Sequence, residues 1–167
     1  KLIINVANTT IDGTISTTGS VLEVNGETTI TTLSPSGNTT ITGSGNLIAT
    51  TLNLNSHALT LSNSKLIVTN AVAFTNGADQ IASAAADLTL TATPTLTAGI
   101  ISSSGGQITL NGTMAAGMTL DLTGATLVMT GDLNAALGSF TTPANLTVDS
   151  TVAATATLTT NNGTVNA

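Results

Sequence analysis

The segment from Gln107 to Val165 reads QITLNGTMAAGMTLDLTGATLVMTGDLNAALGSFTTPANLTVDSTVAATATLTTNNGTV, and it repeats every nineteen residues. Ile108, Leu127, Leu146 and Val165 occupy equivalent places, and a small residue follows the first three in the same register, at Gly112, Gly131 and Ser150. A period near twenty that persists over several copies is typical of a solenoid.

Within each copy an apolar residue returns every six or seven positions, and locally apolar residues alternate with threonine, as in Ile108-Thr109-Leu110. This period of two indicates strands, whereas helical solenoids need about thirty residues or more per unit. Because strand crossovers are generally right-handed, we predict an all-β, right-handed parallel β-helix (β-solenoid). It should have three short strands per coil of about nineteen residues and roughly nine coils, in a single domain over residues 1–167.

Three columns of inward apolar residues can be followed along the whole chain. The first is Ile11, Ile30, Leu47, Leu66, Leu88, Ile108, Leu127, Leu146 and Val165. The second is Ile15, Leu33, Leu52, Val72, Leu96, Met114, Leu133 and Val152. The third is Ile3, Leu22, Ile41, Leu61, Ile81, Ile101, Leu120, Phe140 and Leu158. Asp12-Gly13 is expected to form a turn, and Pro35 and Gly37 a corner.

Composition narrows the range of functions. Apolar residues make up 41% of the chain, charged residues 6% and aromatic residues 1%, and the net charge is −6. A chain without arginine and with this charge is a poor partner for nucleic acid or anionic membranes, and no apolar run approaches the ~18–20 residues of a membrane-spanning helix. Without cysteine there are no disulfides or thiolate metal sites. Since the chain starts with Lys1, we expect a processed chain or an excised fragment.

The repeat loosens between Leu66 and Leu88, where one coil takes about three extra residues. Residues 76–86 fall there and have the strongest helix propensity in the chain, with Asp79 as a candidate N-cap. A one-turn helix or a bulged corner is one interpretation, and a small binding protrusion is the other.

Catalytic chemistry is not expected. Glu23 and Glu27 are the one pair of carboxylates whose spacing suits glycoside hydrolysis, but we expect no basic or aromatic side chain beside them. His57 is expected at a corner, with no second imidazole to share a metal. We therefore predict no enzyme, no catalytic residues, no cofactor and no metal. A polysaccharide-active enzyme and an ice-binding protein are less favoured alternatives, the latter because outward Thr89, Thr109 and Thr147 are interrupted by Val128.

The coil Ile-Thr-Leu-Asn-Gly-Thr-Met (108–114) and its copies resemble the repeats of filamentous-haemagglutinin-type adhesins and autotransporter passengers of Gram-negative bacteria. The resemblance covers essentially the whole chain and implies secretion to the extracellular space or cell surface, a right-handed coil, and a role in surface attachment or biofilm matrix. It identifies no site. The alternative is that the chain is a fragment of a long secreted adhesin.

The chain is expected to associate with itself, because a β-helix exposes strand edges and core at each end. The predicted contact residues are Leu2, Ile3, Ile4, Val6, Leu158 and Val165. The expected product is a head-to-tail homopolymer, that is, a filament, and host or surface glycans are a further candidate partner.

Overall fold

The computed structural model describes residues 1–74, 76–91, 95–96, 98–110, 118–122, 125–129, 139–142, 145–148, 159–160 and 164–166. Side chains are described within 1–74, 76–91, 98–110, 119–122 and 125–128. All regular elements in these ranges are β-strands.

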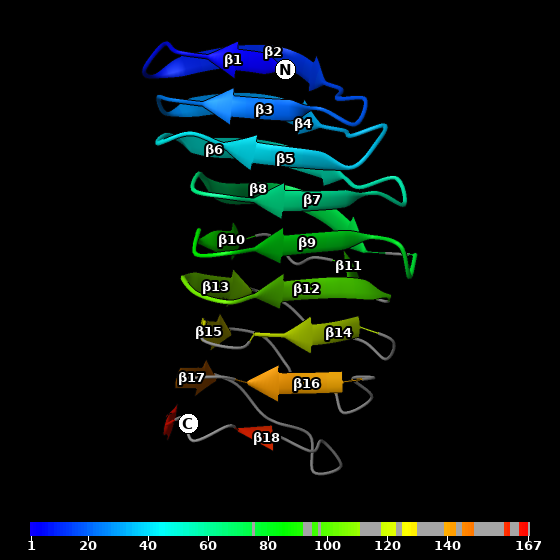
Figure 1. The fold of residues 1–167 in the computed structure, drawn as a ribbon, viewed down its shortest axis with the longest axis vertical. Coiled ribbons are helices and arrows are strands. Elements are labelled where there is room, and N and C mark those ends of the chain that lie inside the picture. The colour runs from blue at the N-terminus through cyan, green and yellow to red at the C-terminus, as the bar shows by residue number, and fades with distance from the viewer. Residues whose placement is uncertain are drawn as a thin grey trace.

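The strands form two parallel sheets that lie back to back along the long axis of the molecule (Figure 1). The first sheet contains, in order, β1 (Leu2–Ile4), β3 (Val21–Val24), β5 (Thr39–Thr42), β7 (Ala58–Leu61), β9 (Gln80–Ser83), β12 (Gly99–Ser103), β14 (Met118–Asp121), β16 (Ser139–Thr142) and β18 (Thr159–Thr160). The second contains β2 (Thr9–Ile15), β4 (Thr28–Leu33), β6 (Asn46–Asn53), β8 (Lys65–Phe74), β10 (Leu88–Leu90), β13 (Gln107–Leu110), β15 (Thr126–Met129), β17 (Asn145–Val148) and β19 (Thr164–Asn166). The two-residue strand β11 (Thr95–Leu96) also pairs with β8.

Successive strands alternate between the sheets, so the chain winds as a coil. In Figure 1 the first sheet runs right to left in front, the second runs left to right behind it, and the chain descends throughout, which makes the coil right-handed. The predicted parallel β-solenoid is confirmed. About six coils lie in the part of the chain that is described nearly continuously, against roughly nine predicted, and β14 to β19 extend both sheets in the same order.

The predicted division into three strands per coil needs correction. In the first four coils the faces of the first and second columns belong to one bent strand, because β2, β4, β6 and β8 each run through the corner between them. The ladder is irregular between Ile11 and Thr14 and between Ala49 and Thr51. Asp12 and Gly13 therefore lie within β2 rather than in a turn, as a bulge that bends the strand without ending it.

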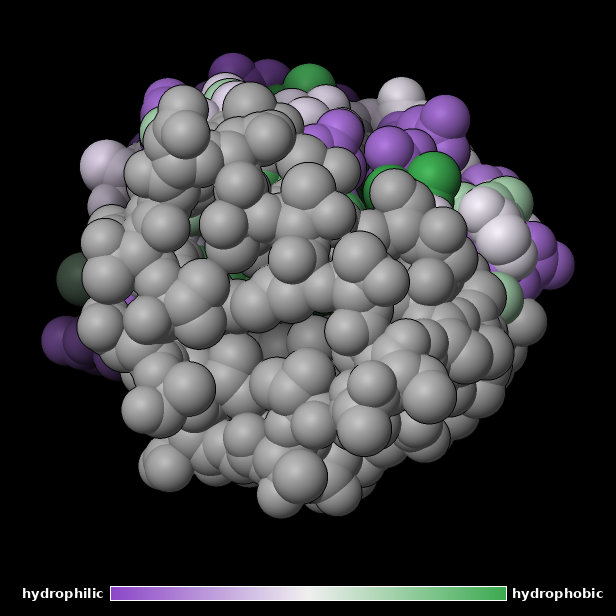
Figure 2. All heavy atoms as spheres, turned by 90° about the horizontal axis from the view of Figure 1, so that it is seen from below, coloured by the Kyte–Doolittle hydropathy of each residue, from purple (hydrophilic) through white to green (hydrophobic). Residues whose placement is uncertain are grey.

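The core is the narrow space between the sheets. Burial alternates along each strand, so Leu22, Ile41 and Leu61 point inward and are completely buried. Each such aliphatic side chain contributes roughly 1.5–3 kcal/mol through burial. Polar residues take the outward positions, and hydrophilic side chains predominate on the described part of the rim in the end-on view (Figure 2).

Most of the predicted column steps are confirmed by the strand register. The steps from Leu47 through Leu66, Leu88, Ile108, Leu127 and Leu146 to Val165 all pair as predicted. So do those from Ile15 through Leu33 and Leu52 to Val72, and those from Ile81 through Ile101 and Leu120 to Phe140. Met114, Leu133, Val152 and Leu158 lie outside the described residues.

Three predicted steps were wrong by two residues. Ile30 pairs with Ala49 rather than Leu47, Leu61 pairs with Ser83 rather than Ile81, and Leu96 pairs with Phe74 rather than Val72. Residues two apart on a strand point to the same face of the sheet. The predicted partner and the true partner therefore both face inward, and the alternation of apolar residues alone could not distinguish them.

A fourth predicted step, from Ile3 to Leu22, was wrong by one residue. A shift of one residue along a strand turns the side chain to the opposite face of the sheet. Leu2, not Ile3, pairs with Leu22, so Leu2 and Ile4 face the core while Ile3 lies opposite Glu23 on the outer face.

The long coil places its extra residues at two corners. Ala49 pairs with Val68, 19 residues later, Asn53 pairs with Ala73, 20 later, and Ala58 pairs with Gln80, 22 later. One extra residue therefore sits at the bend of β8 and two lie between β8 and β9. Residues 76–86, where helix propensity is strongest, do not form the one-turn helix that was one form of the first interpretation: residues 76–79 form a turn, and β9 follows. The outcome is a bulged corner.

Candidate functional sites: an open end and an inserted corner

One end of the solenoid exposes apolar side chains. Leu2, Ile3 and Val6 are 45%, 46% and 65% exposed, and they are the exposed large apolar residues among those described. Leu2 faces the core in register with the fully buried Leu22, and β1 is the edge strand of the first sheet as described. The predicted contact residue Ile4 is buried.

Of the other two predicted contact residues, only Val165 is described, and it lies at the opposite end. Val165 lies in β19, the last strand of the second sheet, and pairs with Leu146. Its side chain, and Leu158 altogether, lie outside the description. The structure therefore separates Val165 from Leu2, Ile3 and Val6 by the full length of the stack (Figure 1).

Glu23 has a basic partner, contrary to expectation. Lys1 Nζ lies 2.6 Å from Glu23 Oε2, and Asn25 Nδ2 donates to Glu23 Oε1 over 2.8 Å. The Lys1 ammonium and then the Asn25 amide lower the pKa of Glu23 below its ordinary value. The sequence pattern did not indicate this pair, because Lys1 and Glu23 meet only when β1 lies on β3. The same Asn25 Nδ2 donates to Asn5 Oδ1, one coil away.

Lys65 Nζ, on β8, lies 4.0 Å from Asp87 Oδ2, just before β10. His57 occupies the corner between β6 and β7, as predicted, and its backbone N–H donates to the Leu54 carbonyl. Within the described ranges no three His, Asp or Glu side chains are close enough to hold a metal ion. The same ranges contain no helix long and apolar enough to cross a membrane.

The outward threonines have the irregular arrangement read from the sequence. Thr89 pairs with Thr109, which pairs with Val128, and Gln107 lies beside Thr126. Ice binding stays an untested alternative.

The inserted corner forms a polar hollow that sequence reasoning missed. It measures about 260 Å³ and is lined by Asn53, Leu54, Asn55, Ser56, Ala73, Asn76 and Asp79. These residues come from two successive coils, β6 with the turn after it and β8 with the turn after it. The signal available in the sequence was the lengthened coil between Leu66 and Leu88.

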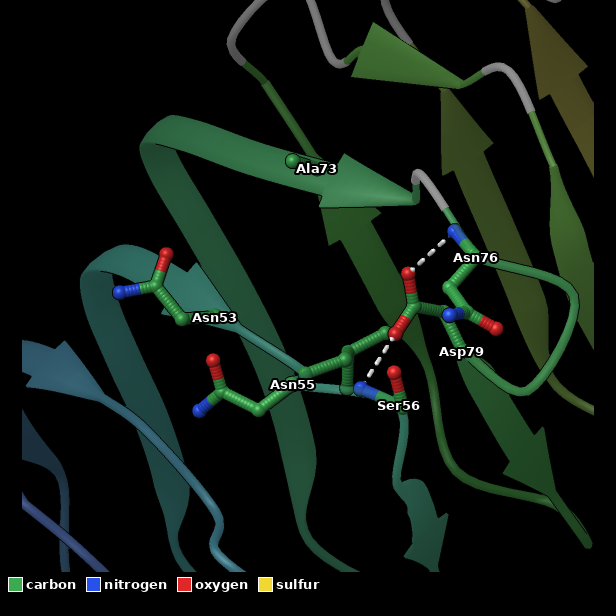
Figure 3. A pocket seen from close by; sticks show the side chains of 7 residues that line it. Asn53, Asn55, Ser56, Ala73, Asn76 and Asp79 are labelled. Carbon is green, nitrogen blue, oxygen red and sulfur yellow. Dashed lines mark hydrogen bonds between the residues drawn. The ribbon is translucent and has the colours of Figure 1, made fainter.

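Asp79 holds this corner together. Its side chain is only 2% exposed. Oδ1 accepts a hydrogen bond from the Ser56 backbone N–H over 2.8 Å, and Oδ2 accepts one from the Asn76 backbone N–H over 2.9 Å (Figure 3). A buried carboxylate is tolerated where such donors compensate for the lost water.

These features define a class: the chain is a right-handed parallel β-solenoid with exposed apolar side chains at and after β1 and with one modified coil. No family model matches the chain, and no curated protein or solved structure matches it at a significant level.

Proposed function

We propose that the chain is a structural subunit that stacks head to tail into an extracellular or cell-surface filament, used in attachment or as biofilm matrix, and that it is not an enzyme. The observation that carries the proposal is the group of exposed apolar side chains at and after β1: Leu2 points into the core column yet is 45% exposed, and Ile3 and Val6 are exposed as well. Large apolar side chains gathered at a surface usually mark an interaction site.

The proposed occupant is a second copy of the chain. In a parallel sheet the two outer strands present complementary rows of N–H and C=O groups. Here β1 and β2 lie at one end of the two sheets, and β18 and β19 lie at the other. The far end of one copy can therefore continue both ladders onto the near end of the next. Such a contact between unlike surfaces does not close and generates fibres.

The proposal of attachment outside the cell rests on chemistry and on the resemblance noted above. The resemblance to filamentous-haemagglutinin-type repeats favours secretion and adhesion. The outer surface carries few charges and many threonines and asparagines, while Glu23 and Asp79 are held by internal partners. This arrangement favours a scaffold over a catalyst. Incubation with acidic and neutral polysaccharides should release no products, and turnover abolished by Glu23→Gln would contradict the proposal.

Electron microscopy of the purified protein tests the assembly. We expect unbranched fibres, with an axial repeat per subunit of roughly 40–45 Å if about nine coils stack at ~4.8 Å each. Val6→Lys should abolish the fibres, because Val6 is 65% exposed at the open end and a lysine there would be desolvated on stacking. Thr60→Lys is the matched control on the outer face of β7, and it should leave the fibres intact.

Monodisperse wild-type protein at high concentration would overturn the homopolymer. In the alternative, this chain is one part of a long adhesin, and a further coil of the same polypeptide covers Leu2. The length of the encoding reading frame distinguishes this alternative from the homopolymer. That alternative predicts a reading frame much longer than 167 residues.

A further inference from the structure

The regular coil is altered most at one corner, where several independent features coincide. Two of the extra residues of the long coil lie there, between β8 and β9. The corner contains the buried carboxylate of Asp79 and the hollow of about 260 Å³. In solenoids, insertions in single repeats map to loops on one face, and that is often the binding face.

The hollow exists because a small residue follows a large one in the same column. Ala73 pairs with Asn53, so a methyl group lies where an asparagine would continue the ladder. Figure 3 shows Asn53 and Asn55 side by side below Ala73, and Asn76 across the corner beside Asp79. These residues line the hollow together with Leu54 and Ser56.

The walls of the hollow are held in place by hydrogen bonds from outside it. Asn55 Nδ2 donates to Ser34 Oγ over 2.9 Å and to the Pro35 carbonyl over 3.1 Å, which fixes the amide and leaves Oδ1 available. Asn55 and Ser56 both have positive φ, 54° and 65°, a conformation uncommon outside glycine. The Ser56 N–H donates to Asp79 Oδ1, which stabilises this backbone conformation.

The side chain of Asn53 makes no hydrogen bond with any residue that the structure describes, and neither does the hydroxyl of Ser56. An amide offers a donor and an acceptor at a fixed separation, a combination that suits a pair of neighbouring hydroxyl groups. We propose that this corner, lined by Asn53, Asn55, Ser56, Ala73 and Asn76, binds a neutral sugar residue of a surface glycan.

Charge and size select the ligand within that class. The residues that line the hollow include no cation, and Asp79 contributes a carboxylate in a chain of net charge −6, so an acidic sugar would be repelled. A volume of about 260 Å³ lies below the ~300–1,000 Å³ typical of pockets for drug-sized ligands. It therefore suits one sugar ring at the end of a chain. The inference deepens the proposed function and rests on its attachment role.

Saturation-transfer NMR on the full chain tests the proposal, because the method tolerates fibres. The probes are the methyl glycosides of glucose, galactose, mannose and N-acetylgalactosamine, with sialic acid as the acidic comparison. We expect transfer to at least one neutral glycoside and none to sialic acid. Ala73→Leu fills the hollow without removing a hydrogen-bonding group and should abolish transfer. Ala71→Leu, an exposed alanine two positions earlier on the same strand, should not.

A second pair of variants removes an amide. Asn53→Ala should weaken binding about two- to tenfold, as expected for one hydrogen bond, and Asn46→Ala at the other end of β6 should have no effect. Absence of transfer from every neutral glycoside, transfer that persists in Ala73→Leu, or preference for sialic acid would each overturn the proposal. Fibres are scored separately by electron microscopy, so loss of sugar binding and failure to assemble are distinguishable.

Discussion

Inward positions in this solenoid accept polar residues only where a hydroxyl finds a partner. Thr17 and Thr39 are buried, and their Oγ1 atoms lie 2.6 Å apart in a hydrogen bond between coils. The Ser64 hydroxyl is also buried and donates to the Thr42 carbonyl over 2.7 Å. Every buried side-chain polar atom among the described residues has such a partner. Small hydroxyl side chains can therefore lie between columns of leucine without an unpaired group.

Shortening a side chain on the inward face of a strand should lower stability far more than shortening one on the outward face. Leu59 is completely buried in β7 and its neighbour Thr60 is exposed. We expect Leu59→Ala to lower the free energy of unfolding by about 2–5 kcal/mol through lost burial and the remaining cavity. Thr60→Ala should change it by less than about 0.5 kcal/mol. Chemical denaturation measures both, and equal effects would show that the inward and outward faces are misassigned.

The Lys1–Glu23 pair gives stability a specific pH dependence. A carboxyl whose pKa is lower in the folded state stabilises the fold at pH values above the unfolded pKa. This contribution is lost as the pH falls through the folded pKa. We therefore expect acidification below the ordinary glutamate range to destabilise the wild type more than Glu23→Gln. Thermal melts over a pH series measure the difference, and parallel curves for the two proteins would contradict the assignment.

At the scale of the element, close stacking of coils makes some corner glycines irreplaceable. Gly43 follows β5 with φ +108°, and a Cβ there would lie 2.1 Å from the Val24 carbonyl oxygen of the preceding coil. Gly77, in the inserted corner, has no atom within 4 Å of the equivalent position. The two glycines therefore have different roles, one imposed by the distance between coils and one not.

Gly43→Ala should destabilise the protein by at least about 1–3 kcal/mol, because the conformation is strained for alanine and the coils must also separate. Gly77→Ala is the matched control and should be neutral or slightly stabilising, because it lowers the entropy of the unfolded chain. Urea denaturation of the two variants provides the comparison. A mild effect of Gly43→Ala would mean that β5 and β3 lie further apart at this corner than described.

At the scale of the whole molecule, stability and assembly should be linked. If copies stack through the end formed by Leu2, Ile3 and Val6, the contact stabilises only the folded state, so the melting temperature should rise with protein concentration. Val6→Lys should remove that dependence while leaving the melting temperature of the dilute protein within a few degrees of the wild type. Calorimetry over a hundredfold range of protein concentration measures how the melting temperature depends on concentration. A concentration-independent wild type would argue against the stack.

The sequence alone was sufficient to predict the fold class, because a β-solenoid repeats one local rule. The alternation of apolar and polar residues along Ile108-Thr109-Leu110 predicts a strand. The same pattern returns nineteen residues later, which predicts that the next coil stacks on this one, and the strands do pair in this register. The same rule correctly located the long coil between Leu66 and Leu88.

Only the tertiary structure decided what depends on pairing between coils. Leu59 and Leu61 are equally apolar and point the same way, so the ladder alone determined that Leu59 pairs with Ile81. Lys1 meets Glu23, and Asp79 holds the Ser56 backbone N–H, across 22 and 23 residues. No periodic pattern encodes these contacts, because each depends on which particular residues two neighbouring coils bring together. The hollow beside Asn53 follows for the same reason, since it required both the insertion and a small residue at Ala73.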